Sequence, residues 1–170
     1  MQMTIDDIEK YPELFAYLGR LGGGALSNAK IVENMSIYGL LSHSKLAHAL
    51  LPGVGPQLRI KTLFGGGCLA GTDAFGCFDP AFPGRIYLDK DMVTHFEIDP
   101  KSSDMMLTTA TGAKVPLVGV TVLHELVHWG HYWGSAFSDE PDERGDAFEK
   151  ATYGKLVSKT AFISFQAVGE

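Results

Sequence analysis

VTVLHELVHWGHYW, at residues 120–133, is the stretch that decides how this chain folds. It contains an HExxH motif, in which His124 and His128 stand four residues apart. Side chains four apart on an α-helix lie one above the other, so both imidazoles can bind one metal ion. Glu125 points to the side of this pair and can reach a water on the metal without binding the metal itself. The motif therefore predicts a zinc-binding helix that carries a general base.

The predicted helix spans residues 116–132 and is expected to be buried. Val120, Leu123 and Val127 give it an apolar stripe. Two histidines and a glutamate on a buried helix need polar partners or a metal ion. The alternative is an ordinary core helix whose histidines are satisfied by hydrogen bonds.

A catalytic zinc ion takes three protein ligands and leaves one position for water, so a third ligand must come from outside the motif. His131 is one candidate, but it lies seven residues from His124, about 10 Å along a helix axis. We therefore expect His131 to donate a hydrogen bond to the transition state, or to be a surface residue at the helix end.

A second predicted helix, at residues 141–158, offers four carboxylates: Asp142, Glu143, Asp146 and Glu149. Glu149 shares a partly apolar face with Tyr153 and Leu156, which favours Glu149 as the third ligand. Asp146 ranks next and Glu143 last, because Glu143 shares a face with a lysine and is expected to be solvated. An ion pair is the alternative role for Glu149. Tyr153 is expected to stabilise a developing oxyanion, or to pack in the core.

The composition predicts one domain over residues 1–170, with a helical part at 1–64 and a catalytic core at 85–170. The chain is 45% hydrophobic and carries a formal net charge of −6. This charge argues against a nucleic-acid binder and a polybasic membrane-surface protein. No apolar run has transmembrane length, and the acidic start does not resemble a signal peptide.

The order of predicted elements indicates an α+β fold, mostly helical, with a small sheet beside the HExxH helix. Thr4 is expected to cap a first helix that Pro12 breaks or restarts. The other elements expected are helices at 25–38, 44–51 and 91–97, strands at 59–64, 85–89 and 161–168, a hairpin within 105–115 and a long loop at 65–84. Strand 85–89 is the candidate edge for pairing with an extended substrate.

Two cysteines, Cys68 and Cys77, lie in the glycine-rich segment GGGCLAGTDAFGC. They either form a disulfide that closes a small loop or remain two buried thiols. A zinc site made of cysteines is not expected, because the chain has no second pair.

Three segments carry a resemblance to a known family: VLHELVHWG at residues 122–130, GDAFEKATYG at residues 145–154 and the preceding IYLDKDMV at 86–93. The first two resemble the zincin-like metallopeptidase toxin domains of bacterial polymorphic toxin and type VI secretion systems, and the third is similar to the lead-in of the same domains. The resemblance covers residues 85–157, and the N-terminal half is not part of it. His131 stands where that family pattern would have another residue.

The resemblance implies a zincin fold and a secreted antibacterial effector that hydrolyses peptide bonds. It places Zn²⁺ on His124, His128 and Glu149, with Glu125 as the base. It also implies a cognate immunity protein, export by a dedicated system without a signal peptide, and action in the periplasm or cytoplasm of a target cell. The alternatives are a zinc hydrolase of a non-peptide or cell-wall amide, and a catalytically silent zinc-binding module.

Overall fold

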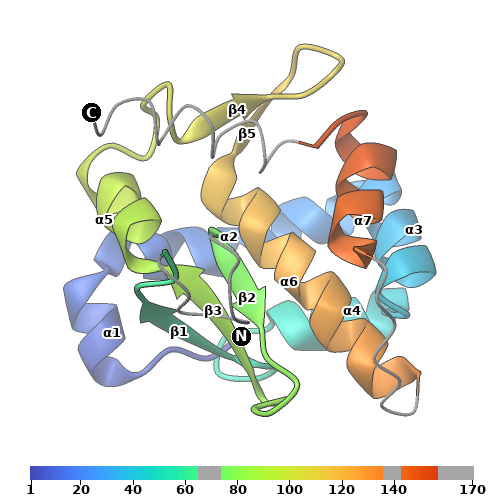
Figure 1. Ribbon diagram of the computed structural model, residues 1–170, viewed down its shortest axis with the longest axis horizontal. Helices are drawn as coiled ribbons and strands as arrows, with labels where there is room; N and C mark the ends of the chain where they lie inside the picture. Colours follow the sequence, from blue (N-terminus) through green and yellow to red (C-terminus); the bar gives the residue numbers. More distant parts are fainter. Residues whose placement is uncertain (65–73, 136–142, 157–170) are drawn as a thin grey trace.

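The computed structural model describes residues 1–64, 74–135 and 143–156. Within those residues it has seven helices and five strands (Figure 1). The helices are α1 (Ile5–Lys10), α2 (Pro12–Ser27), α3 (Ala29–Tyr38), α4 (His43–Leu50), α5 (Lys90–Ile98), α6 (Leu117–Gly134) and α7 (Arg144–Tyr153). The strands are β1 (Gln57–Lys61), β2 (Gly76–Phe78), β3 (Arg85–Asp89), β4 (Met106–Thr108) and β5 (Lys114–Pro116). The predicted α+β class, mostly helical with a small sheet, is confirmed.

The N-terminal part folds into four helices whose ends follow local capping chemistry. The hydroxyl of Thr4 accepts a hydrogen bond from the Asp7 backbone N–H, and Pro12 occupies the first turn of α2, both as predicted. The predicted helix start at residue 25 is wrong, because α2 continues through its glycines to Ser27. The break lies at Asn28, whose side chain accepts two backbone hydrogen bonds at the start of α3.

The three-stranded sheet has the order β1-β3-β2, with β1 parallel and β2 antiparallel to β3. Strand β3 is therefore central, and the prediction that residues 85–89 form a substrate-pairing edge is wrong. Strand β2 falls inside the stretch predicted as a loop from its glycines. Its three residues are buried, so burial in the sheet outweighs the low strand propensity of glycine.

Helix α6 runs through the middle of the molecule, with the sheet on one side and α7 on the other (Figure 1). The sheet thus lies beside the HExxH helix, as predicted. Nearly all of α6 from Leu117 to Val127 is buried, which accounts for its apolar composition. Phe148 of α7 is fully buried and contributes to the same core as Leu123 and Leu126.

Strands β4 and β5 form the predicted hairpin, which leads directly into α6. The backbone N–H of Ala110, in the hairpin loop, donates to the carbonyl of Tyr153, so the hairpin is fixed to the end of α7. The predicted strand at 161–168 and Cys68 lie outside the described residues, whereas Cys77 is disulfide-bonded. None of the described helices is both long and apolar enough to cross a membrane.

Candidate metal centre

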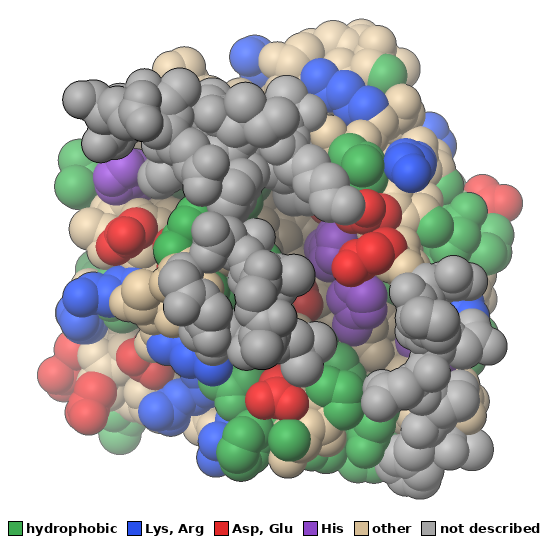
Figure 2. All heavy atoms as spheres, in the orientation of Figure 1, with side chains coloured by type: hydrophobic (Ala, Val, Ile, Leu, Met, Phe, Trp, Pro, Cys, Tyr) green, Lys and Arg blue, Asp and Glu red, His purple; other side chains and the backbone are tan. Residues whose placement is uncertain are grey.

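His124, His128 and Glu143 form a group that can hold a metal ion. One potential ligand atom from each residue lies within 4.8 Å of those of the other two. The two imidazole rings are 5.2 Å apart between centroids, as the spacing of four residues on α6 predicted. Histidine side chains lie next to acidic side chains on one face of the molecule (Figure 2). The arrangement therefore presents two imidazoles and a carboxylate together at the surface.

Glu143 owes its position to the start of α7. It is the residue directly before Arg144, where the helix begins, and its backbone is not helical. Helical periodicity predicts that Glu143 lies on a solvated face, and therefore ranks it last among the carboxylates as a ligand. The position of Glu143 at the start of the helix is the feature that predicts its different direction. An N-cap residue has a non-helical backbone, so its side chain need not point to the face that helical periodicity assigns to it.

Glu149 contacts the motif in a different way from Glu143. Its Oε1 lies 2.8 Å from Nδ1 of His124, and its side chain has no exposure to solvent. A hydrogen bond to Nδ1 leaves Nε2 of the same ring for a metal ion. Carboxylates in this position fix the orientation of ligand imidazoles in many metal sites. The predicted role of Glu149 as a direct ligand stays a prediction, while the geometry favours an orienting role.

Gly145 packs against the face of the His124 imidazole. A Cβ atom at this position would lie 2.2 Å from Nε2 of His124, far inside van der Waals contact. Glycine is therefore required at the start of α7, where the backbone approaches the imidazole. Its close packing keeps α7, and with it Glu143, against the HExxH helix.

The protonation of the two histidines differs because their surroundings differ. Burial disfavours protonated His124, but the hydrogen bond to Glu149 and the charges of the neighbouring glutamates raise its pKa to about 9. Burial, with the nearby positive charge of His124, lowers the pKa of His128 to about 3. His128 is therefore neutral, whereas a metal ion would have to displace a proton from His124.

Glu125 lies between α6 and β2. It is 5% exposed, and the backbone N–H of Phe78 donates a hydrogen bond to its carboxylate. A Cβ on Gly76 would lie 2.7 Å from Oε1 of Glu125, so only glycine lets the strand pass this close. Burial raises the pKa of Glu125 to about 7, against the opposing effect of His124. A carboxyl group with this pKa can both accept and donate a proton near neutral pH.

The remaining predicted site residues lie outside the group of three. His131 is 9% exposed and lies one turn beyond His128, and its charge contributes to the low pKa of His128. Tyr153 is 8% exposed, and its ring packs against Phe148 at 6.0 Å between centroids. Burial and the charge of Glu149 raise the pKa of Tyr153, so it keeps its proton. Asp146, ranked second as a ligand, is buried at 7% exposure and is not in the group.

The donor set fits zinc. Two imidazoles and one carboxylate are a known protein shell of catalytic zinc, in which a fourth position is left to water. The unprotonated state of His128 also suits metal binding. A cluster of oxygen ligands, which calcium or magnesium would need, is absent from this group.

A family model described as metallopeptidase toxin 3 matches residues 7–154, which is most of the chain and includes the whole group described above. No curated protein and no solved structure matches the chain.

Proposed function

The chain belongs to the metallopeptidase toxin 3 family, and from this premise we propose that it is a zinc-dependent peptidase. The observation that carries the proposal is the convergence of His124, His128 and Glu143, with Glu125 beside them. The family description supports a protein or peptide substrate. The zincin architecture predicted from the sequence is part of the same proposal.

We assign the third zinc ligand to Glu143 and an orienting role to Glu149. Glu143 is exposed and lies among the ligand atoms of the two histidines, whereas Glu149 is engaged with Nδ1 of His124. A buried carboxylate on the outer nitrogen of a ligand histidine makes the ring a better donor. The competing assignment is Glu149 as the direct ligand, which the sequence pattern favours. Zinc binding by glutamine variants of Glu143 and Glu149 separates the two assignments.

The chemistry divides between the metal and the protein. When bound, zinc would act as a Lewis acid that lowers the pKa of a water molecule and polarises the scissile carbonyl. Glu125, with a pKa of about 7, is placed to accept the proton of the attacking water and to donate it to the leaving amine. His131, which follows His128 by one turn of α6, is the candidate for a donor to the developing oxyanion. Tyr153 lines a cavity that none of the metal-site residues lines.

An extended substrate would run along β2. Strand β2 is the edge strand of the three-stranded sheet that contacts α6, and the side chain of Glu125 lies directly against it. Peptides commonly bind enzymes and adaptor domains by adding a strand to a sheet. Strand β2 therefore takes the role that the sequence argument gave to residues 85–89.

The biological setting is proposed from the family description and the resemblance. The chain would act as an antibacterial effector, exported by a dedicated pathway such as type VI secretion and neutralised in the producing cell by an immunity protein. Its substrate would lie in the target cell. The competing functions are hydrolysis of a cell-wall amide and zinc binding without catalysis. Glu125 argues against the silent module, since a structural zinc site needs no base.

The test of the proposal is a comparison of substrates. Zinc-loaded protein would be incubated with a proteome-derived peptide library and, in parallel, with purified peptidoglycan, and new amino termini would be identified by mass spectrometry. We expect cleavage of peptides by the wild type and none by Glu125→Gln. Release of cell-wall fragments without peptide cleavage would support the cell-wall amidase instead. Zinc binding with neither reaction would support the silent module.

A further inference from the structure

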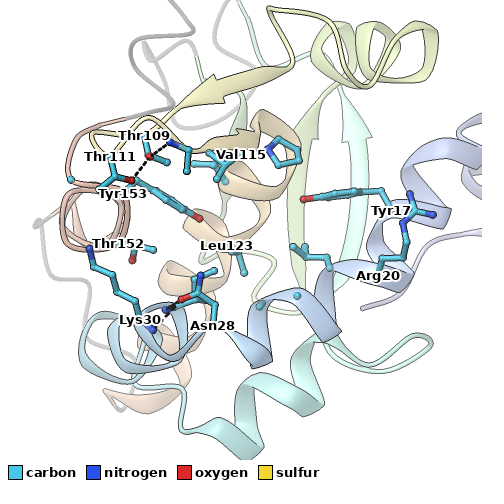
Figure 3. Close-up of a pocket in the computed structure, with 18 residues that line it drawn as sticks. Tyr17, Arg20, Asn28, Lys30, Thr109, Thr111, Val115, Leu123, Thr152 and Tyr153 are labelled. Carbon is cyan, nitrogen blue, oxygen red and sulfur yellow. Dashed lines mark hydrogen bonds between the residues drawn. The ribbon is translucent and has the colours of Figure 1, made fainter.

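A cavity of about 580 Å³ lies beside Val120 and Leu123 of α6 (Figure 3). Its walls come from α2, the start of α3, the β4–β5 hairpin, α6 and the end of α7. None of His124, His128, Glu125 and Glu143 lines it. The cavity has the size of a small-molecule site and is separate from the proposed peptidase site.

Most of the cavity wall is apolar. Aliphatic side chains face it from four elements: Leu21 and Ala25, Ile31, Val115, Val120 and Leu123. Val120 and Leu123 belong to the apolar stripe of the HExxH helix, so the back of this helix forms part of the wall. Such a surface favours the hydrocarbon portion of a ligand, because binding removes apolar area from water.

The polar residues that line the cavity are three threonines, two tyrosines, an asparagine, an arginine and a lysine. The hydroxyls of Tyr17 and Tyr153 point into it from opposite sides (Figure 3). Burial raises the pKa of Tyr17 to about 12, and Tyr153 is shifted in the same direction, so both remain hydrogen-bond donors at neutral pH. A donor pair of this kind suits a ligand with oxygen acceptors.

The charged side chains that line the cavity are both cations. Arg20 on α2 and Lys30 on α3 are exposed and lie at its outer part, and Arg20 is close enough to influence the Tyr17 hydroxyl. None of the 18 lining residues is Asp or Glu, although the chain has 20 acidic residues and a net charge of −6. Charge complementarity therefore favours an anion over a cation in this cavity.

We propose that this cavity is a second ligand site, for a small carboxylic acid with an apolar body. The hydrocarbon part would contact the aliphatic wall, and the carboxylate would accept from a tyrosine hydroxyl in the field of Arg20 and Lys30, which lie at opposite ends of the cavity (Figure 3). A bound ligand would also touch Tyr153, one helical turn from Glu149 on α7. The site is independent of the proposed peptidase reaction.

The binding test uses three eight-carbon probes with the same chain. Octanoate, octanol and octylammonium would be titrated into the whole metal-free protein and followed by calorimetry or protein NMR. We expect saturable binding of octanoate and binding of octylammonium that is about tenfold weaker or absent. Replacing both Arg20 and Lys30 by glutamine should weaken the binding of octanoate by about fivefold and leave the binding of octanol unchanged.

A pair of glycines supplies a matched control. Gly24 lines the cavity and Gly23 does not, yet both are exposed residues of α2 with nothing within 4 Å of a Cβ atom. Gly24→Leu should weaken octanoate by about tenfold or more, because its side chain occupies the mouth, whereas Gly23→Leu should have no effect. Absence of saturable octanoate binding to the wild type, or binding that survives Gly24→Leu, would overturn the proposal. Since no zinc or substrate is present, either outcome leaves the peptidase proposal untouched.

Discussion

Nδ1 of His124 and Oε1 of Glu149 are 2.8 Å apart, which joins the HExxH helix to α7 through a fully buried carboxylate. This contact fixes the imidazole ring, whose face packs against Gly145 at the start of α7. Glu143, the residue directly before the start of α7, completes the group. Positioning of the proposed zinc site thus depends on how α7 docks, as well as on the motif.

Zinc binding by glutamine variants should separate the roles of the two glutamates. Glu143→Gln removes a proposed ligand, and Glu149→Gln weakens the orientation of His124. Loss of an orienting partner commonly lowers metal affinity by roughly 10–100-fold. We expect Glu149→Gln to fall in that range and Glu143→Gln to lose more. Titration against a zinc-buffering chelator measures both.

The control for this comparison is Glu33→Gln, which removes an exposed carboxylate on α3 that has no place in the metal group. It should bind zinc like the wild type. A greater loss in Glu149→Gln than in Glu143→Gln would return the third ligand to Glu149.

The His124–Glu149 pair should lower the stability of the metal-free protein as the pH rises from 6.5 to 9, most visibly above pH 8. Between pH 6 and 8 the Met1 amino group, whose pKa burial lowers to about 6, acts in the opposite direction. The pKa of His124 is about 9 in the folded chain against an ordinary value of 6.5, so in this window the folded state holds a proton that the unfolded state has released. The contribution of the protonated His124–Glu149 pair is therefore complete below pH 6.5 and lost as the pH passes 9. Glu125, whose pKa is raised to about 7, acts in the same direction only up to that pH.

Thermal unfolding of chelator-treated protein across this pH range measures the effect. Glu149→Gln should flatten the dependence, because it removes the hydrogen-bonded negative charge. Saturating zinc should also abolish the decline, since a metal ion requires the neutral imidazole. A wild type whose melting temperature follows the same pH dependence as that of Glu149→Gln from pH 6.5 to 9 without metal would show that the pair does not hold this proton.

Gly145→Ala should abolish zinc binding with little effect on the rest of the fold. The added methyl group would lie 2.2 Å from Nε2 of His124, so the ring or the start of α7 must move. Gly23→Ala is the matched control, because it is also a helical glycine and its Cβ meets nothing within 4 Å. Zinc content and circular dichroism of the two variants give the answer; full zinc binding by Gly145→Ala would contradict the packing described.

Gly76→Ala should separate catalysis from metal binding. Its Cβ would lie 2.7 Å from Oε1 of Glu125 and 2.6 Å from the methyl group of Thr121, while no ligand atom is among its three nearest neighbours. We expect turnover to fall by about 100-fold, as for the misplacement of a catalytic group by about 1 Å, with zinc content unchanged. Loss of zinc together with activity would mean that β2 supports the ligands as well as the base.

The sequence was most informative where function depends on local spacing. The HExxH helix, the hairpin before it and the caps at Thr4 and Pro12 follow from patterns of a few residues, and each lies where predicted. The sheet order does not follow from local pattern. Residues 85–89 alternate like an edge strand, but they lie between β1 and β2 because of pairings with residues far along the chain.

The carboxylates of α7 show the same limit. Helical periodicity correctly marked Glu149 as inward-facing, and it is fully buried next to His124. Periodicity was not informative for Glu143, because this residue precedes the helix and its direction depends on the turn at Arg144. The choice between a ligand and an orienting partner depends on a distance across two helices, which spacing within one helix cannot give.

The central claim is that zinc held by this group, with Glu125 as base, hydrolyses peptides. Its most direct test is to measure zinc content and peptide cleavage in the same samples of wild type and Glu125→Gln. We expect about one zinc per chain in both proteins, since one His₂Glu shell holds one ion, and cleavage in the wild type alone. No zinc in the wild type after reconstitution, or equal cleavage by Glu125→Gln, would contradict the proposed mechanism.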